Sequence, residues 1–191
     1  MREKIVPELI LKVVHKLIND LESMYVSSNV NELRENEKDP NTKAFKMNME
    51  THIFEAIIST LHSFLLSKNT EIDIRVYICS HIMENSEKYM DFSINSDINS
   101  NKLVLCFNYE ILFLIFNSKF EYFSEKIENY LIALNNFLKN FARTEYSSKL
   151  KGLNIFIEKL NDLINSMEEK LKRYKIEKQT DIPNEVNQEN N

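Results

Sequence analysis

Two His-x-x-Glu pairs are the side chains in this sequence whose types and spacing come nearest to metal chemistry. His52 is followed by Glu55, and His81 by Glu84, so the members of each pair would share one face of a helix. Helical bundles that bind two metal ions use the opposite order, Glu-x-x-His, with further glutamates pointing inward. The helical phase also places both histidines opposite the apolar stripes of their segments, toward water. We therefore expect no metal site and no cofactor.

The triplet Cys79-Ser80-His81 contains a nucleophile and a base as neighbours in sequence. Consecutive residues of a helix point about 100° apart, so these side chains would not meet. Cys79 and Cys106 both lie in apolar segments, where cysteine packs as a small apolar residue. Two isolated cysteines give neither a disulfide framework nor a four-ligand zinc site, which favours a reducing intracellular compartment. We expect no catalytic residue and a cytoplasmic location, with the nucleus as the alternative.

Oxygen-bearing side chains alternate along one polar segment much as they do in a calcium-binding loop: Asp91, Ser93, Asn95, Asp97 and Asn99. Such a loop needs glycine at its sixth position and a bidentate glutamate at its twelfth. This chain has Ser96 and Lys102 at those positions. The sequence therefore predicts a solvated polar loop over residues 91–102 that does not bind calcium.

Composition excludes several other classes of site. The chain has 191 residues but a single glycine, Gly152, so the glycine-rich loops that bind phosphates are absent. With 24 Lys+Arg against 29 Asp+Glu, the net charge is −5, which argues against a nucleic-acid surface. The longest apolar run, Leu103–Phe116, contains Asn108 and Glu110 and is too short to cross a bilayer. Glu110 would pair with a lysine or hydroxyl side chain of another helix, or it would lie on a solvent-exposed side of this run.

The elements that would position these residues are helices, because apolar residues recur at intervals of three and four along almost the whole chain. Leu103–Phe116 is apolar on nearly all sides and is expected to be the central helix. The sequence has no repeat of solenoid period. The predicted fold is all-α, a bundle of about six helices. Its other helices are expected from Pro7, from Asp39-Pro40 to about Asn69, from Thr70 as N-cap, and from Phe116 to about Arg143, with a polar loop at Ser27–Asp39.

The C-terminal element carries a heptad seam, with apolar residues at alternating intervals of three and four from Leu150 to Tyr174. Such a seam is typical of a coiled-coil helix. We expect residues 1–147 to form the bundle, 148–178 the heptad helix, and 179–191 a disordered tail. The heptad helix would pack on the bundle, on a partner, or on both. Its expected partner-binding residues are Ile157, Leu160, Ile164, Met167, Leu171 and Tyr174.

Three classes of function remain open on the sequence. The heptads and the wide apolar faces favour a non-catalytic scaffold or adaptor subunit of an intracellular assembly, which binds another protein or a second copy through its C-terminal helix. The His/Glu pairs keep a metal–carboxylate enzyme as an alternative. A basic cluster in the last helix keeps a peripheral membrane or regulatory module as another, although interleaved glutamates make a solvated flank the simpler interpretation: Lys170, Lys172, Arg173, Lys175 and Lys178.

Overall fold

The computed structural model describes residues 2–32, 40–144 and 153–180. All of the regular structure in these ranges is helical and no strand occurs in them, which confirms the all-α prediction. The elements are α1 (Arg2–Glu32), α2 (Pro40–Leu66), α3 (Ile72–Glu84), α4 (Ser86–Ile94), α5 (Ile98–Leu114), the π-helical turn η1 (Ile115–Lys119), α6 (Phe120–Ala142) and α7 (Leu153–Thr180).

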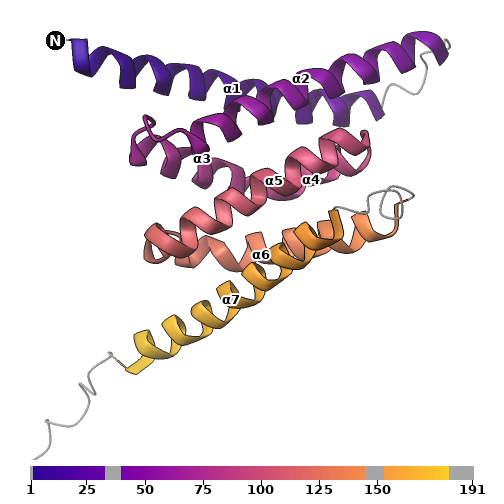
Figure 1. The fold of residues 1–191 in the computed structure, drawn as a ribbon. Helices are drawn as coiled ribbons and strands as arrows, with labels where there is room; N and C mark the ends of the chain where they lie inside the picture. Colours follow the sequence, from indigo (N-terminus) through magenta and orange to yellow (C-terminus); the bar gives the residue numbers. More distant parts are fainter. Residues whose placement is uncertain (1, 33–39, 145–152, 181–191) are drawn as a thin grey trace, which may run out of the picture.

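The helices form three stacked pairs: α1 with α2, the broken helix α3–α4 with α5, and α6 with α7 (Figure 1). One layer contains α2, α5 and α7, with α5 contacting both of the others. The second layer contains α1, α3–α4 and α6, and its helices run opposite to those of the first (Figure 1). Stacked pairs of this kind build helical-repeat proteins, although this sequence has no repeat. Among the described helices, each outer pair therefore has a neighbouring pair on one side only.

The predicted helix starts are only partly correct. Pro7 lies inside α1, which begins at Arg2, whereas α2 does begin at Pro40. The loop predicted at Ser27–Asp39 is wrong up to Glu32, where α1 ends, and residues 33–39 lie outside the described ranges. Thr70 does not cap α3, because Glu71 is the N-cap residue. The Thr70 carbonyl instead accepts hydrogen bonds from the Arg75 guanidinium at 2.8 and 3.0 Å.

The polar loop predicted over residues 91–102 is almost entirely helical. α4 extends to Ile94 and α5 begins at Ile98, which leaves only residues 95–97 between them. Asp97 caps α5, since its Oδ1 accepts from the amides of Asn99 and Ser100 at 2.8 and 2.9 Å. Aspartate is a favoured N-cap residue, so the polarity of this segment marks the start of a helix rather than a loop.

The expected central helix is present as α5, which contacts α2, α4 and α7. It starts earlier than predicted, and no loop follows it, because η1 carries the chain directly into α6. The chain changes direction at Lys119, whose φ is −138° and ψ 26°.

The continuous helical stretch Ile98–Ala142 contains a window long and apolar enough to cross a membrane by length and composition, and 44% of that window is buried in the chain. A core helix of a soluble protein meets the same criteria, so this is weak evidence of a span.

The heptad helix is α7, and it packs against α5 and α6 of its own chain. Four of the six predicted seam residues are buried there, namely Leu160, Ile164, Met167 and Leu171, while Ile157 and Tyr174 are half-buried. Residues 175–180 are exposed on every side. The predicted domain boundary at 147 and residues 181–191 of the predicted tail lie outside the described ranges.

Candidate functional site

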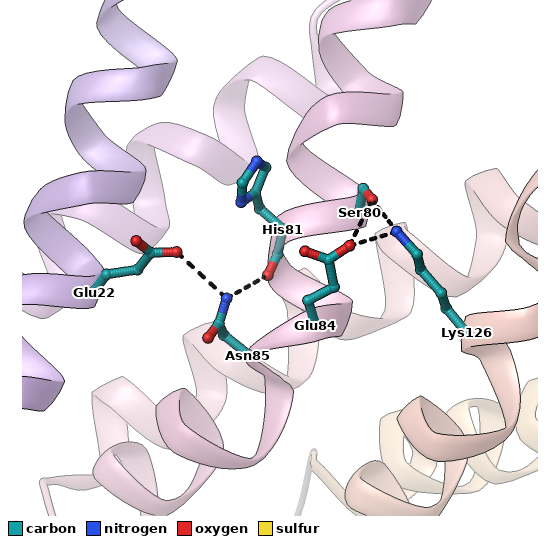
Figure 2. Close-up of polar contacts among 6 residues, drawn as sticks. All are labelled: Glu22, Ser80, His81, Glu84, Asn85 and Lys126. Carbon is teal, nitrogen blue, oxygen red and sulfur yellow. Dashed lines mark hydrogen bonds and ion pairs between the residues drawn. The ribbon is translucent and has the colours of Figure 1, made fainter.

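Polar side chains from three helices of one layer meet around the end of α3, and we call them the α3 cluster: Glu22, Ser80, His81, Glu84, Asn85 and Lys126 (Figure 2). Asn85 lies at the break between α3 and α4. Its Nδ2 donates to Glu22 Oε1 of α1 at 3.4 Å and to the His81 carbonyl at 3.2 Å. Lys126 of α6 reaches the same end of α3 from the other side (Figure 2).

Ser80 is the only hydroxyl of the α3 cluster, and its surroundings do not activate it. Lys126 Nζ donates to Ser80 Oγ at 2.9 Å and also pairs with Glu84, while Ser80 Oγ donates to Glu84 Oε1 at 3.4 Å. The hydrogen bond from Lys126 lowers the pKa of Glu84, which makes this carboxylate a weaker base. A serine nucleophile needs a base that accepts its proton near neutral pH. The arrangement therefore joins α3 to α6 rather than preparing a nucleophile.

Three aromatic rings extend the α3 cluster toward α1. The Tyr77 ring lies 4.4 Å from the ring centroids of both His15 and His81, and Tyr77 Oη and His15 Nδ1 are 2.5 Å apart. Burial, followed by the negative charge of Glu22, raises the pKa of the Tyr77 hydroxyl. The phenol is thus held in its protonated form between two imidazoles, and it links α3 to α1.

The two His-x-x-Glu pairs do not converge on one site. His52 Nδ1 lies 3.5 Å from Glu55 Oε2 on α2, with the histidine side chain 77% exposed, whereas His81 and Glu84 lie on α3 in the cluster above. His81 is half-buried against Tyr77 rather than fully in water as predicted. Over the described ranges, no group of three or more His, Cys, Asp or Glu side chains could hold a metal ion.

The remaining candidate residues from the sequence lie in the core or are half-buried. Cys79 is fully buried, and burial raises the pKa of its thiol to about 12, as expected of a core residue. Cys106 is only half-buried, so its packing is looser than predicted. Glu110 is also half-buried, and burial raises the pKa of its carboxyl group. Of the calcium-like residues, Ser93 lies in the core and donates to Asn101 Oδ1 at 3.3 Å.

A buried hydrogen-bonded triad joins α4, α5 and α6, and the sequence analysis missed it. The hydroxyls of Tyr89 and Tyr130 both donate to Asn108 Oδ1, each at 2.6 Å. All three side chains are completely buried. Asn108 Nδ2 donates to the Val104 carbonyl at 2.7 Å, so every polar group of the amide is used. The available signal was a lone amide within an apolar run, which has to find partners in the core.

A groove of about 690 Å³ lies where η1 and the start of α6 meet the C-terminal half of α7, and we call it the π-turn groove. Its walls carry the aromatic residues Phe116, Phe120, Tyr122 and Tyr174. Its size lies within the 300–1,000 Å³ typical of ligand sites, and π-helical turns occur frequently at functional positions. The groove is therefore the strongest candidate binding site among the described residues.

Lys170 lines the π-turn groove, with its ammonium group over two aromatic rings. Its Nζ donates to the Phe116 carbonyl at 2.7 Å and lies 4.7 Å from the centroids of both Phe116 and Phe120. Tyr174 packs edge-on against Phe120, with the centroids 5.7 Å apart. The sequence interpretation of Lys170 as part of a solvated flank is thus wrong, because the π-turn brings a carbonyl and two rings to its ammonium group.

No protein-family model, no curated protein and no solved structure matches this chain.

Proposed function

We propose that this protein is a non-catalytic helical scaffold or adaptor that binds protein partners through helix contacts within an intracellular assembly. The observation that supports this most is the stack of three helix pairs, in which the outer pair α6–α7 contacts a neighbouring pair on one side only within residues 2–32, 40–144 and 153–180. Stacks of helix pairs offer long surfaces to partners and need no catalytic machinery. The π-turn groove opens on this same outer pair.

The predicted seam cannot serve as the partner surface while α7 stays docked. Leu160, Ile164, Met167 and Leu171 are buried in the chain's own core, and a partner could reach them only after α7 left α5 and α6. We therefore propose that the partner contacts the outer side of α7. Ile155 marks that side, since it lies opposite the seam and is 61% exposed.

The polar contacts of the α3 cluster support the same assignment. Its polar side chains contact one another between α1, α3 and α6, as expected of groups that join helices. Lys126 and Glu84 are both substantially exposed, so their ion pair adds at most about 1 kcal/mol to stability. No observation on the described residues favours the metal–carboxylate enzyme or the membrane-surface module over the scaffold.

The proposal is tested by isolating the protein from its native cells under mild conditions and measuring its mass by sedimentation. We expect a complex in which one or a few partners are present in stoichiometric amounts. Cross-linking should join those partners to the exposed Lys159 and Lys172 of α7. Native protein that sediments as a 22.7 kDa monomer with no stoichiometric partner would refute the scaffold role.

A matched pair of variants locates the contact. Ile155→Glu should weaken the complex, because it places a charge on the outer side of α7. Ile132→Glu provides the control, since Ile132 lies on α6 and is comparably exposed at 52%. Equal loss of the complex in both variants would argue against a specific surface on α7.

A further inference from the structure

We propose that the π-turn groove binds a carboxylate carried beside an apolar side chain on a partner peptide, with Lys170 as the group that recognises the carboxylate. This inference rests on the proposed function, because it names the kind of segment that the partner presents. Three features of the groove support it: the unused hydrogen-bond donors of Lys170, the apolar walls around that side chain, and the balance of charge in the lining.

The ammonium group of Lys170 has N–H donors that the described residues do not use. It carries three N–H donors, and the hydrogen bond to the Phe116 carbonyl uses one of them. Two other cations of α7 each have a carboxylate: Arg173 pairs with Glu169 at 3.4 Å, and Lys175 pairs with Glu128 at 2.6 Å. Lys170 has no carboxylate partner among the described residues, although it is half-buried. A cation held in this way favours an anionic ligand.

The walls of the groove favour an apolar group next to that anion. The ammonium group lies 4.7 Å from the ring centroids of both Phe116 and Phe120. Phe120 is buried, whereas Phe116 and Tyr174 are half-buried and Tyr122 is 65% exposed. The accessible parts of these last three rings can supply apolar contact area to a ligand. An anion alone would leave this surface unused, whereas a peptide that also carries an apolar side chain would cover it.

The charge of the groove selects a carboxylate over phosphate groups or a nucleic acid. The lining includes three cations, Lys119, Lys170 and Arg173, and two carboxylates, Glu121 and Glu177, which leaves a net charge of +1. Arg173 also pairs with Glu169 through one guanidinium nitrogen at 3.4 Å, so a carboxylate just outside the lining offsets part of its charge. A phosphate dianion or a polyanion would be repelled by the two lining carboxylates, whereas a single carboxylate brings less negative charge into this weakly positive groove.

The test is a chemical-shift titration of the full-length, ¹⁵N-labelled protein with three short peptides that differ at one position. The probes are acetyl-Leu-Glu-Phe-amide, the same peptide with glutamine in place of glutamate, and the same peptide with phosphoserine. We expect the glutamate peptide to shift the amide signals of residues 116–122 and 170–174. Its Kd should be in the millimolar range and about tenfold lower than that of the glutamine peptide, as one charge-assisted contact provides.

Variants assign the preference to one side chain. Lys170→Gln should reduce the difference between the glutamate and glutamine peptides to less than about twofold. Lys175→Gln is the matched control, because it removes a lysine of the same helix that is already paired with Glu128, and it should retain the preference. Circular dichroism checks that both variants keep their helices. If Lys170→Gln does not fold, Lys170→Arg should keep the preference, and Lys119→Gln should weaken binding of the glutamate peptide.

Several results would overturn the inference. Equal binding of the glutamate and glutamine peptides would remove the role of charge, and a preference that persists in Lys170→Gln would assign it elsewhere. Tighter binding of the phosphoserine peptide would identify a phosphate site, and absence of any shift in residues 116–122 would show that the groove does not bind this class of ligand. Failure of the scaffold proposal is distinguishable, because it is measured on native complexes and leaves this titration unaffected.

Discussion

Replacing Asn108 with leucine tests the buried triad of Tyr89, Asn108 and Tyr130. The amide oxygen accepts both tyrosine hydroxyls at 2.6 Å, and all three side chains are fully buried. Burial raises the pKa of both tyrosines above the ordinary value of 10.0, so the phenols stay protonated and act as donors. Asn108→Leu keeps a similar volume while it removes the acceptor that α4 and α6 share.

The expected cost follows from the number of groups left unpaired. A buried polar group that loses its partner costs about 1–3 kcal/mol. The hydroxyls of Tyr89 and Tyr130 also interact with each other, so one of them can still accept from the other, and Asn108→Leu should lower the free energy of unfolding by about 1–3 kcal/mol. Either single change, Tyr89→Phe or Tyr130→Phe, leaves Asn108 with one donor and should cost only about 0.5–1.5 kcal/mol. Making both changes strands the amide oxygen, so the double variant should lose more than the sum of the single losses.

Urea unfolding followed by circular dichroism measures these differences. Tyr122→Phe is the control, because Tyr122 is on α6 but 65% exposed, and it should change stability by less than about 0.5 kcal/mol. The triple variant Tyr89→Phe, Asn108→Leu and Tyr130→Phe should recover most of the lost stability, because it leaves no polar group of the triad without a partner. A loss below about 1 kcal/mol in Asn108→Leu, or strict additivity of the two tyrosine changes, would refute the reasoning.

Three further predictions concern the core and its titratable groups. Leu171→Asp should destabilise the whole fold by more than about 3 kcal/mol, because the charge enters the chain's own core, whereas Ile155→Asp on the exposed side of α7 should leave the urea midpoint almost unchanged. Burial lowers the pKa of His62 from 6.5, and its Nε2 has no hydrogen-bond partner in the part of the chain that the structure describes. The unfolded chain therefore binds a proton more readily than the folded chain. The melting temperature should therefore fall as pH drops below about 6.5. His62→Leu should reduce this dependence of the melting temperature on pH, whereas the control His52→Leu should leave it unchanged. Cys79, with its pKa raised to about 12, should react with iodoacetamide only in denaturant; rapid labelling of the folded protein would show that the α3 core opens readily.

The helical content and much of the burial pattern follow directly from local features of the sequence. One glycine and three prolines leave few places to interrupt a helix, and the spacing of three and four assigns a buried face to each segment. The heptad residues Leu160, Ile164 and Leu171 are buried, and the apolar run around Phe107 became the central helix α5. Errors occurred at the ends, where Asp97 caps a helix and its polarity had suggested a loop.

The tertiary structure alone decided which of these faces meet. Periodicity identifies the side of α7 that needs a partner, but it does not say whether α5 and α6 or another chain provides it, because leucine and isoleucine faces pack with many others. The candidate sites depend even more on how the helices pack against one another. Tyr89, Asn108 and Tyr130 come from three helices, and Lys170 meets Phe116 only because η1 turns the chain toward α7. A short hydrogen bond fixes positions to fractions of an ångström, whereas the spacing of residues along a helix sets only the direction in which a side chain points.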